Sequence, residues 1–184
     1  NAAQKKGYDD LKKRHVKDFG SLFGRVSLDL NGTDEGLPTD ELVKRYKSGT
    51  HSQYLEALYF VYGRYLLISS SRPGTYPSSL QGTWNRYTSS PCSSGYWHNI
   101  NVQMNYWPAF NTNLSECFIA YINYFLAYKP LVQRLASEYI KKHFPDKYED
   151  GETNNGWNIG TGAWLYTVEG NPAPLTSHSG PSTG

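Results

Sequence analysis

The segment 96–108 holds the densest group of side chains in this sequence that could do chemistry. Its thirteen residues include two indoles, one imidazole and four amides, which belong to Asn99, Asn101, Gln103 and Asn105. An amide offers both a donor and an acceptor and stays neutral, so a group of amides can hold sugar hydroxyls or position a water molecule. If a helix begins just after Asn99, then Asn99 and Asn101 could both reach one bound molecule.

Helix capping is the second interpretation of these amides. Asn is common at helix starts, where its side chain satisfies free backbone groups, and spacing alone supports capping and ligand binding equally. His98 could transfer protons, but a histidine without a placed partner is more often a structural residue. No Ser-His-Asp set, nucleotide-binding glycine loop or zinc-ligand spacing can be assembled, so we predict no metal site.

The composition favours a sugar over a nucleic acid as the ligand class. Aromatic residues reach 15% while charged residues stay at 18%, below the roughly 25% of an average domain. Tyr and Trp match the C–H face and hydroxyl edge of a sugar ring, although core packing explains aromatic richness more often. The net charge of +2 is spread along the chain apart from basic residues at 5–14, which predicts a solvated helix face and no nucleic-acid partner.

The sequence shows neither a membrane-spanning segment nor a signal-peptide pattern. No apolar run approaches the roughly 20 residues that a membrane helix needs, and the first residues lack the charged-then-apolar plan of a signal peptide. We therefore expect no membrane span. Cys92 and Cys117 show no metal-ligand pattern, and one bridge between them is conceivable.

Apolar periodicity predicts that helices position the polar segment. The expected helices cover 8–26, 40–47, 54–68, 100–107, 116–127 and 131–143. Thr39 is expected to cap the second helix, and Pro130 to lie in the first turn of the last. The third helix is apolar nearly all round, which predicts burial on most sides, and Tyr8 and Leu11 should face inward from the first.

A long loop and few strands complete the expected architecture. Turn residues crowd 69–95, and large rings such as Trp84 and Tyr87 in so long a loop favour an ordered, functional segment. Pro108 should end or bend the helix before it. No series of alternating strands is present, and 165–168 would be an isolated strand, so the predicted class is mainly α.

Several long motifs resemble glycoside hydrolase family 95. The central ones are SSRPGT at 70–75, LQGTWN at 80–85, NINVQMNYWPA at 99–109 and NLSEC at 113–117. Upstream, HVKDF at 15–19, LFGRVSL at 22–28 and LPTDE at 37–41 resemble the early helices of the same family. The motifs follow one another in the family's order, and the likeness is closest over residues 11–130.

The resemblance implies an all-α fold, part of an (α/α) six-hairpin barrel with long loops. Residues 1–184 would be the N-terminal portion of that catalytic domain, and the remainder of the domain would be a necessary partner. The implied reaction is hydrolysis of terminal α-linked L-fucose, or of L-galactose in some relatives, with inversion and without a cofactor. The substrate class in turn implies a secreted or periplasmic location.

The family's Asn-x-Asn pair maps onto Asn99 and Asn101, which would hold and activate the attacking water. An amide is a poor base, so a carboxylate must assist, and inversion needs an acid on the opposite face of the sugar. In the family these are an Asp and a Glu further along the chain, and both should lie past Gly184. The isolated chain should therefore be inactive.

The resemblance also suggests that four residues line the sugar pocket, namely Trp84, Asn85, Trp97 and His98. Trp157 and Trp164 are weaker candidates, since tryptophan more often fills a core than binds a sugar. The stretch 96–98 departs from the pattern of many relatives, which leaves the linkage preference open.

Two rival functions remain compatible with the residues. In one, the chain is a non-catalytic glycan-binding module in which Asn99 and Asn101 only bind hydroxyls. In the other, the same barrel acts on a different glycan, because helix-pair barrels host several glycosidase activities. Carboxylates in the rest of the domain would distinguish the first rival, and a panel of terminal sugars the second.

Overall fold

The structure, a computed structural model, describes residues 5–98, 100–159, 162–163 and 182–183. Most of these residues are helical, as the periodicity predicts. The chain divides into two compact units, one made of residues 1–69 and 112–114, the other of residues 70–111 and 115–184. Each unit is described by itself below.

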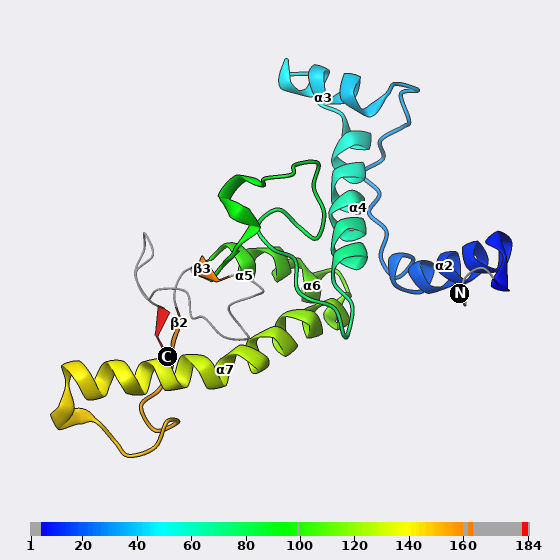
Figure 1. Ribbon diagram of the computed structural model, residues 1–184. Helices are drawn as coiled ribbons and strands as arrows, with labels where there is room; N and C mark the ends of the chain where they lie inside the picture. The colour runs from blue at the N-terminus through cyan, green and yellow to red at the C-terminus, as the bar shows by residue number, and fades with distance from the viewer. Residues whose placement is uncertain (1–4, 99, 160–161, 164–181, 184) are drawn as a thin grey trace. The chain divides into compact units, whose positions relative to one another are not determined.

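The described residues of the first unit include the helices α2 (Tyr8–Phe23), α3 (Thr39–Lys47) and α4 (Gln53–Ser70) (Figure 1). Their positions confirm the three helices that the sequence predicts there. The predicted cap of α3 is wrong, because Thr39 is already helical and no side chain caps that helix. A serine caps α4 instead: the Oγ of Ser52 accepts the N–H of Leu55 at 3.2 Å and donates to Glu35 Oε1 at 2.6 Å.

Arg64 joins α4 to the end of α2. Its guanidinium is 3% exposed and donates to the carbonyls of Leu22, Phe23 and Val26 at 3.0, 2.7 and 3.1 Å. The last carbonyls of a helix have no partner within it, and a cation there also interacts favourably with the helix dipole. One buried arginine therefore holds the C-terminal end of α2 against α4.

Two burial predictions for this unit are wrong. Tyr59 and Tyr62 on α4 are 79% and 53% exposed, so this helix is not enclosed on most sides. Tyr8 and Leu11 on α2, which should face inward, are also exposed. Apolar periodicity shows which face seeks a partner, but the neighbours within this unit cover only part of that face.

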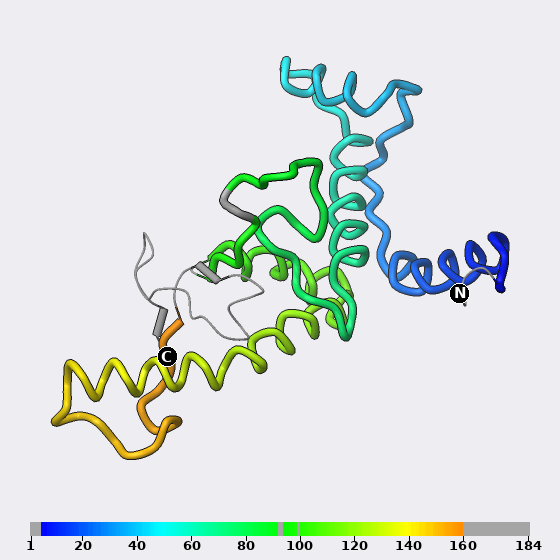
Figure 2. Tube along the Cα trace, in the orientation of Figure 1, coloured from blue at the N-terminus to red at the C-terminus, as the bar shows by residue number. Residues whose placement is uncertain are grey.

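The second unit begins with a loop over 71–95 that ends in a short 3-10 helix, η1 (Pro91–Ser94); Figure 2 follows its course. Then come β1 (Tyr96–Trp97), α5 (Asn101–Tyr106), α6 (Pro108–Asn111) and α7 (Ser115–His143), followed by η2 (Pro145–Lys147). The break between α5 and α6 at Pro108 confirms the predicted effect of that residue.

Short antiparallel strand pairs are the only strands in the described ranges. Strand β1 pairs with β3 (Gly162–Ala163), and β2 (Asn158–Ile159) pairs with β4 (Ser182–Thr183). Segments far apart in sequence thereby meet beside α5 and α7. The stretch 165–168, predicted to be an isolated strand, lies outside the described residues.

Helix α7 corrects the prediction of two helices separated at Pro130. It is one helix of 29 residues with this proline inside it. Its buried residues recur at spacings of three and four on both sides of Pro130 and so form one stripe: Cys117, Ala120, Tyr124, Tyr128, Val132 and Ala136. Pro130 itself is exposed, as is Leu126, so water can bond the carbonyl that the proline leaves without a partner.

The core of the second unit is built on this stripe. A buried cluster joins three of its residues to β1, α5 and β2, and its members are Tyr96, Val102, Tyr124, Tyr128, Val132 and Ile159. The rings of Tyr96 and Tyr124 lie 4.7 Å apart in a tilted arrangement, a geometry that aromatic pairs favour. Through Val102 the cluster fixes α5, which carries the predicted site.

A pair of glycine substitutions tests the packing at the start of α4. A Cβ on Gly32 would lie 2.3 Å from the backbone nitrogen of Tyr54, whereas a Cβ on Gly63, within α4, would meet nothing within 4 Å. We expect Gly32→Ala to lower the free energy of unfolding by about 1–3 kcal/mol through overpacking. Gly63→Ala should raise it by about 0.5–1 kcal/mol through helix propensity.

Urea unfolding followed by far-UV circular dichroism measures both changes. Equal effects of the two substitutions would contradict the close approach at Gly32.

Candidate functional site

Helix α5 presents Asn101 at its first turn. Asn101 is the first helical residue, its side chain is exposed, and among the described residues it makes no hydrogen bond. Ile100 occupies the capping position, and no side chain caps the helix there. The capping interpretation therefore gains no support from Asn101, which stays available to a ligand. Asn99 lies outside the described residues.

The other two amides of the segment hold loop backbone. Asn105 Nδ2 donates to the carbonyls of Ser78 and Ser79 at 3.3 and 3.2 Å. Gln103 Nε2 donates to the carbonyl of His98 in a short hydrogen bond. Of the three amides on α5, one faces solvent and two position the chain around it.

Tyr106, the last residue of α5, is a polar anchor that the sequence analysis missed. It is 1% exposed, and its hydroxyl accepts the N–H of Ser78 and shares a hydrogen with Ser71 Oγ, each at 2.7 Å. Burial raises the pKa of the Tyr106 hydroxyl, and the bonds to Ser71 and Ser78 offset part of this rise, so the group stays neutral. The partner residues lie about 30 residues earlier in the sequence, so no local pattern around Tyr106 indicates this role.

His98 lies in a buried aromatic cluster. It is 3% exposed, its Nε2 lies 2.9 Å from the hydroxyl of Tyr124, and its ring stacks on Tyr124 and Tyr128 with centroids 5.7 and 6.0 Å away. Burial, and then the nearby Tyr128 and Tyr96, raise the pKa of Tyr124, which therefore stays a hydroxyl and can donate to Nε2. The role of His98 in lining a sugar pocket stays a prediction.

The remaining predicted residues lie before α5. Trp84 is 51% exposed on the long loop. Asn85 shapes that loop, because its Oδ1 accepts the N–H of Tyr87 at 2.8 Å and its Nδ2 donates to Ser90 Oγ at 2.9 Å. Trp97 is partly buried in β1, and its indole N–H meets no acceptor among the described residues.

Trp97 and His98 precede α5 and Asn101 begins it, but the side chain of His98 is buried against α7 whereas that of Asn101 is exposed. The structure holds Trp84 and Asn85 on the loop over 71–95, whose Ser78 and Ser79 are bonded to α5.

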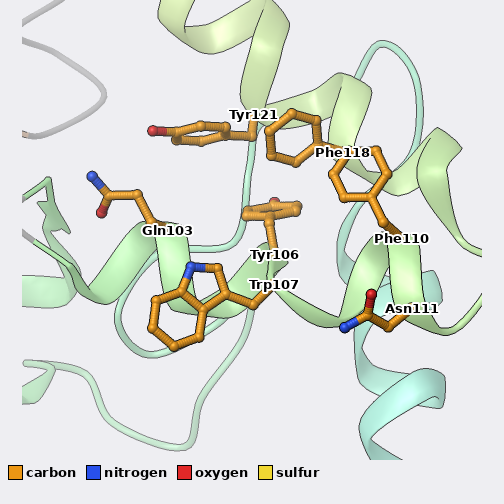
Figure 3. Close-up of a pocket in the computed structure, with 7 residues that line it drawn as sticks. All are labelled: Gln103, Tyr106, Trp107, Phe110, Asn111, Phe118 and Tyr121. Carbon is orange, nitrogen blue, oxygen red and sulfur yellow. The ribbon is translucent and has the colours of Figure 1, made fainter.

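A pocket of about 530 Å³ lies beside α5, and Figure 3 shows the side chains that line it. Its walls come from α5, α6 and α7 and comprise Gln103, Tyr106, Trp107, Phe110, Asn111, Phe118 and Tyr121. None of the residues predicted to bind substrate lines it. Trp107 and Phe110 are 59% and 60% exposed, so the pocket presents open aromatic surface.

Metal clusters and membrane-spanning helices are absent from the described ranges. Nowhere in those ranges do three or more His, Cys, Asp or Glu side chains gather as they would around a metal ion. None of the helices there combines the length and the apolarity needed to cross a bilayer.

Comparison with known proteins defines the class and then the family. A model of the glycosyl hydrolase family 95 catalytic domain matches residues 7–176, which include every element from α2 to β3. The class is therefore the glycosyl hydrolases. This chain belongs to family 95 of that class, which confirms the resemblance seen in the motifs.

The chain is also similar to two curated proteins. It is 37% identical over 185 residues to Alpha-L-fucosidase 2 of Arabidopsis thaliana, in an alignment that covers 91% of this chain and 22% of that protein. It is 47% identical over 117 residues to Probable alpha-fucosidase A of Aspergillus niger, covering 62% of this chain and 14% of that protein. The chain therefore spans about a fifth, or less, of the length of these relatives.

Removing one hydroxyl tests the arrangement around His98. Tyr124→Phe removes the buried hydrogen bond between this hydroxyl and His98 Nε2, and we expect the free energy of unfolding to fall by about 1–3 kcal/mol. Tyr139→Phe on the exposed side of the same helix is the matched control and should change it by less than about 0.5 kcal/mol. Urea denaturation of both variants gives the comparison, and equal losses would show that the Tyr124 hydroxyl is unimportant to the cluster.

Proposed function

We propose that this chain is part of an enzyme that hydrolyses terminal α-L-fucosyl linkages of glycans with inversion, with α-L-galactosyl linkages as the alternative substrate. Asn99 and Asn101 hold the attacking water. The observation that carries the proposal is the family 95 match across the Asn-x-Asn motif, together with the exposed, unbonded amide of Asn101 at the start of α5. Both relatives are named as fucosidases, which supports L-fucose as the sugar.

The chemistry of an amide explains why this segment needs the rest of its domain. Asn101 can orient a water through a donor and an acceptor but cannot take up its proton near neutral pH. A carboxylate must accept that proton, and a second one must protonate the leaving oxygen from the opposite face of the sugar. Both are proposed to come from the part of the domain past Gly184.

The barrel is part of the same proposal. Residues 1–184 form the first portion of an (α/α) six-hairpin barrel, and the remainder of the domain closes it. The exposed tyrosines of α4, among them Tyr59 and Tyr62, and the open rings of Trp107 and Phe110 are the kind of surface that further helices bury. A secreted or periplasmic location follows from the glycan substrate and is proposed on that ground alone.

Two rivals define what the experiment must separate. A non-catalytic module would bind the glycan through the same amides without cleaving it. A glycosidase of different specificity would cleave another terminal sugar. Trp84, Asn85, Trp97 and His98 are proposed to line the sugar pocket of the enzyme.

The test assays release of L-fucose from 2′-fucosyllactose by the complete catalytic domain that includes this chain. We expect activity from the wild type, and the β anomer of L-fucose as the first product in the proton NMR spectrum, because inversion of an α linkage gives β. Asn101→Ala should lower kcat by roughly 10²–10⁴-fold, since it removes a group that positions the water for proton transfer.

Asn154→Ala is the matched control. This exposed amide donates to the carbonyl of Asp150 in the loop after α7, away from the proposed chemistry, and its loss should leave kcat unchanged. Binding without cleavage would favour the module, and a panel of terminal sugars would reveal a different glycosidase. Full activity of Asn101→Ala would remove the water-holding role.

A further inference from the structure

Two adjacent residues at the end of α5 bind both backbone polar groups of one loop residue. Tyr106 takes the N–H of Ser78 at 2.7 Å, and Asn105 donates to the carbonyl of Ser78 at 3.3 Å. The Tyr106 hydroxyl also forms a hydrogen bond of 2.7 Å with Ser71 Oγ, and Ser71 Oγ in turn forms one of 3.2 Å with Ser70 Oγ. Because these groups are buried, no water can replace a lost bond without rearrangement.

Ser78 is followed directly by a tight turn over residues 79–82. Ser79 Oγ donates to the carbonyl of Gly82 at 2.8 Å, and the backbones of the two residues form an isolated antiparallel β-bridge. Gly82 has a φ of +76°, a value that favours glycine. Trp84 and Asn85 follow within three residues. The anchor at Tyr106 therefore fixes the base of the loop that carries two predicted sugar contacts.

The other end of the same helix carries the proposed catalytic amide. Asn101 and Tyr106 are five residues apart, a rise of about 7.5 Å along one continuous helix. A helix of this length moves as one body. A shift of the helix at Tyr106, caused by losing the hydrogen bonds of its hydroxyl, therefore also shifts Asn101. The helix thus joins the water-holding residue and the loop through one rigid connection.

We propose that Tyr106 is a positioning residue, whose hydroxyl sets Asn101 and the loop bearing Trp84 and Asn85 at the separation needed to engage one sugar. The inference rests on the proposed function and deepens it. Tyr106 acts through Asn101 and the loop and does not touch the reacting atoms. Its ring fills the core, and only its hydroxyl is assigned this role.

The substitution Tyr106→Phe removes the hydroxyl and keeps the ring. In the complete catalytic domain we expect kcat for L-fucose release to fall roughly 10–100-fold, because small misplacements of reacting groups have effects of this size. KM should change by less than about threefold, since ground-state contacts are largely kept. Ser71→Ala, which leaves the Ser78 bond in place, should give a fall of about threefold and serves if Tyr106→Phe folds poorly.

Tyr121→Phe is the matched control. Its ring stacks on Tyr106 at 5.6 Å, but its hydroxyl makes no hydrogen bond among the described residues. Its kcat should equal that of the wild type. Hydrogen exchange read by mass spectrometry adds a structural measure: peptides containing Ser78 should exchange faster in Tyr106→Phe, while peptides of α7 stay protected.

The outcomes separate this inference from the proposed function. An active wild type with wild-type kcat in both Tyr106→Phe and Ser71→Ala overturns the positioning role and leaves the proposed function intact. Unchanged exchange at Ser78 overturns the anchor itself. A wild type that releases no L-fucose overturns the proposed function, and this inference with it.

Discussion

The buried stripe along α7 is the constraint on which the second unit depends. Strand β2, helix α5 and strand β1 all contribute residues to the cluster formed on Tyr124, Tyr128 and Val132. Each fully buried side chain of this size contributes about 1.5–3 kcal/mol, whereas a proline inside a helix costs about 3 kcal/mol. The residues buried on either side of Pro130 therefore outweigh its cost, and the helix continues through it. Ending α7 at Pro130 would have removed Val132 and Ala136 from the core.

The polar side chains of α5 have two different roles in the candidate site: some hold the backbone of neighbouring segments, and one faces solvent. Val102 faces the core, Gln103 and Asn105 hold backbone carbonyls, and Asn101 faces solvent. The side-chain nitrogens of Gln103 and Asn105 already donate to backbone carbonyls, so these two amides are held by the loop, whereas neither end of the Asn101 amide is engaged by the described residues. The density of amides nevertheless located the helix that carries the exposed amide of Asn101.

Periodicity predicted the helices well because it depends on neighbours three and four residues away, as in α2, α3, α4 and α5. It failed where the decisive contact is distant in sequence. Arg64 binds carbonyls about 40 residues earlier, and Tyr106 binds a loop 28 residues earlier, and neither contact leaves a local pattern. The prediction that α4 is buried on most sides was wrong for a related reason. A sequence shows which residues are apolar, but not how many neighbouring elements the unit supplies to cover them.

The proposed site is neutral, so its proposed chemistry depends on carboxylates from elsewhere in the domain. Asn101 carries no charge, and no carboxylate of the described residues bonds to it, so its pairing with a water gains nothing from a local base. Its exposure is what allows a carboxylate from another part of the domain to approach the same water. Within this segment the geometry of the amide is fixed by the core on α7 and by the anchor at Tyr106. Under the proposed function, carboxylates from the rest of the domain would meet a helix that is held in place, so that only their own positions would remain to be set.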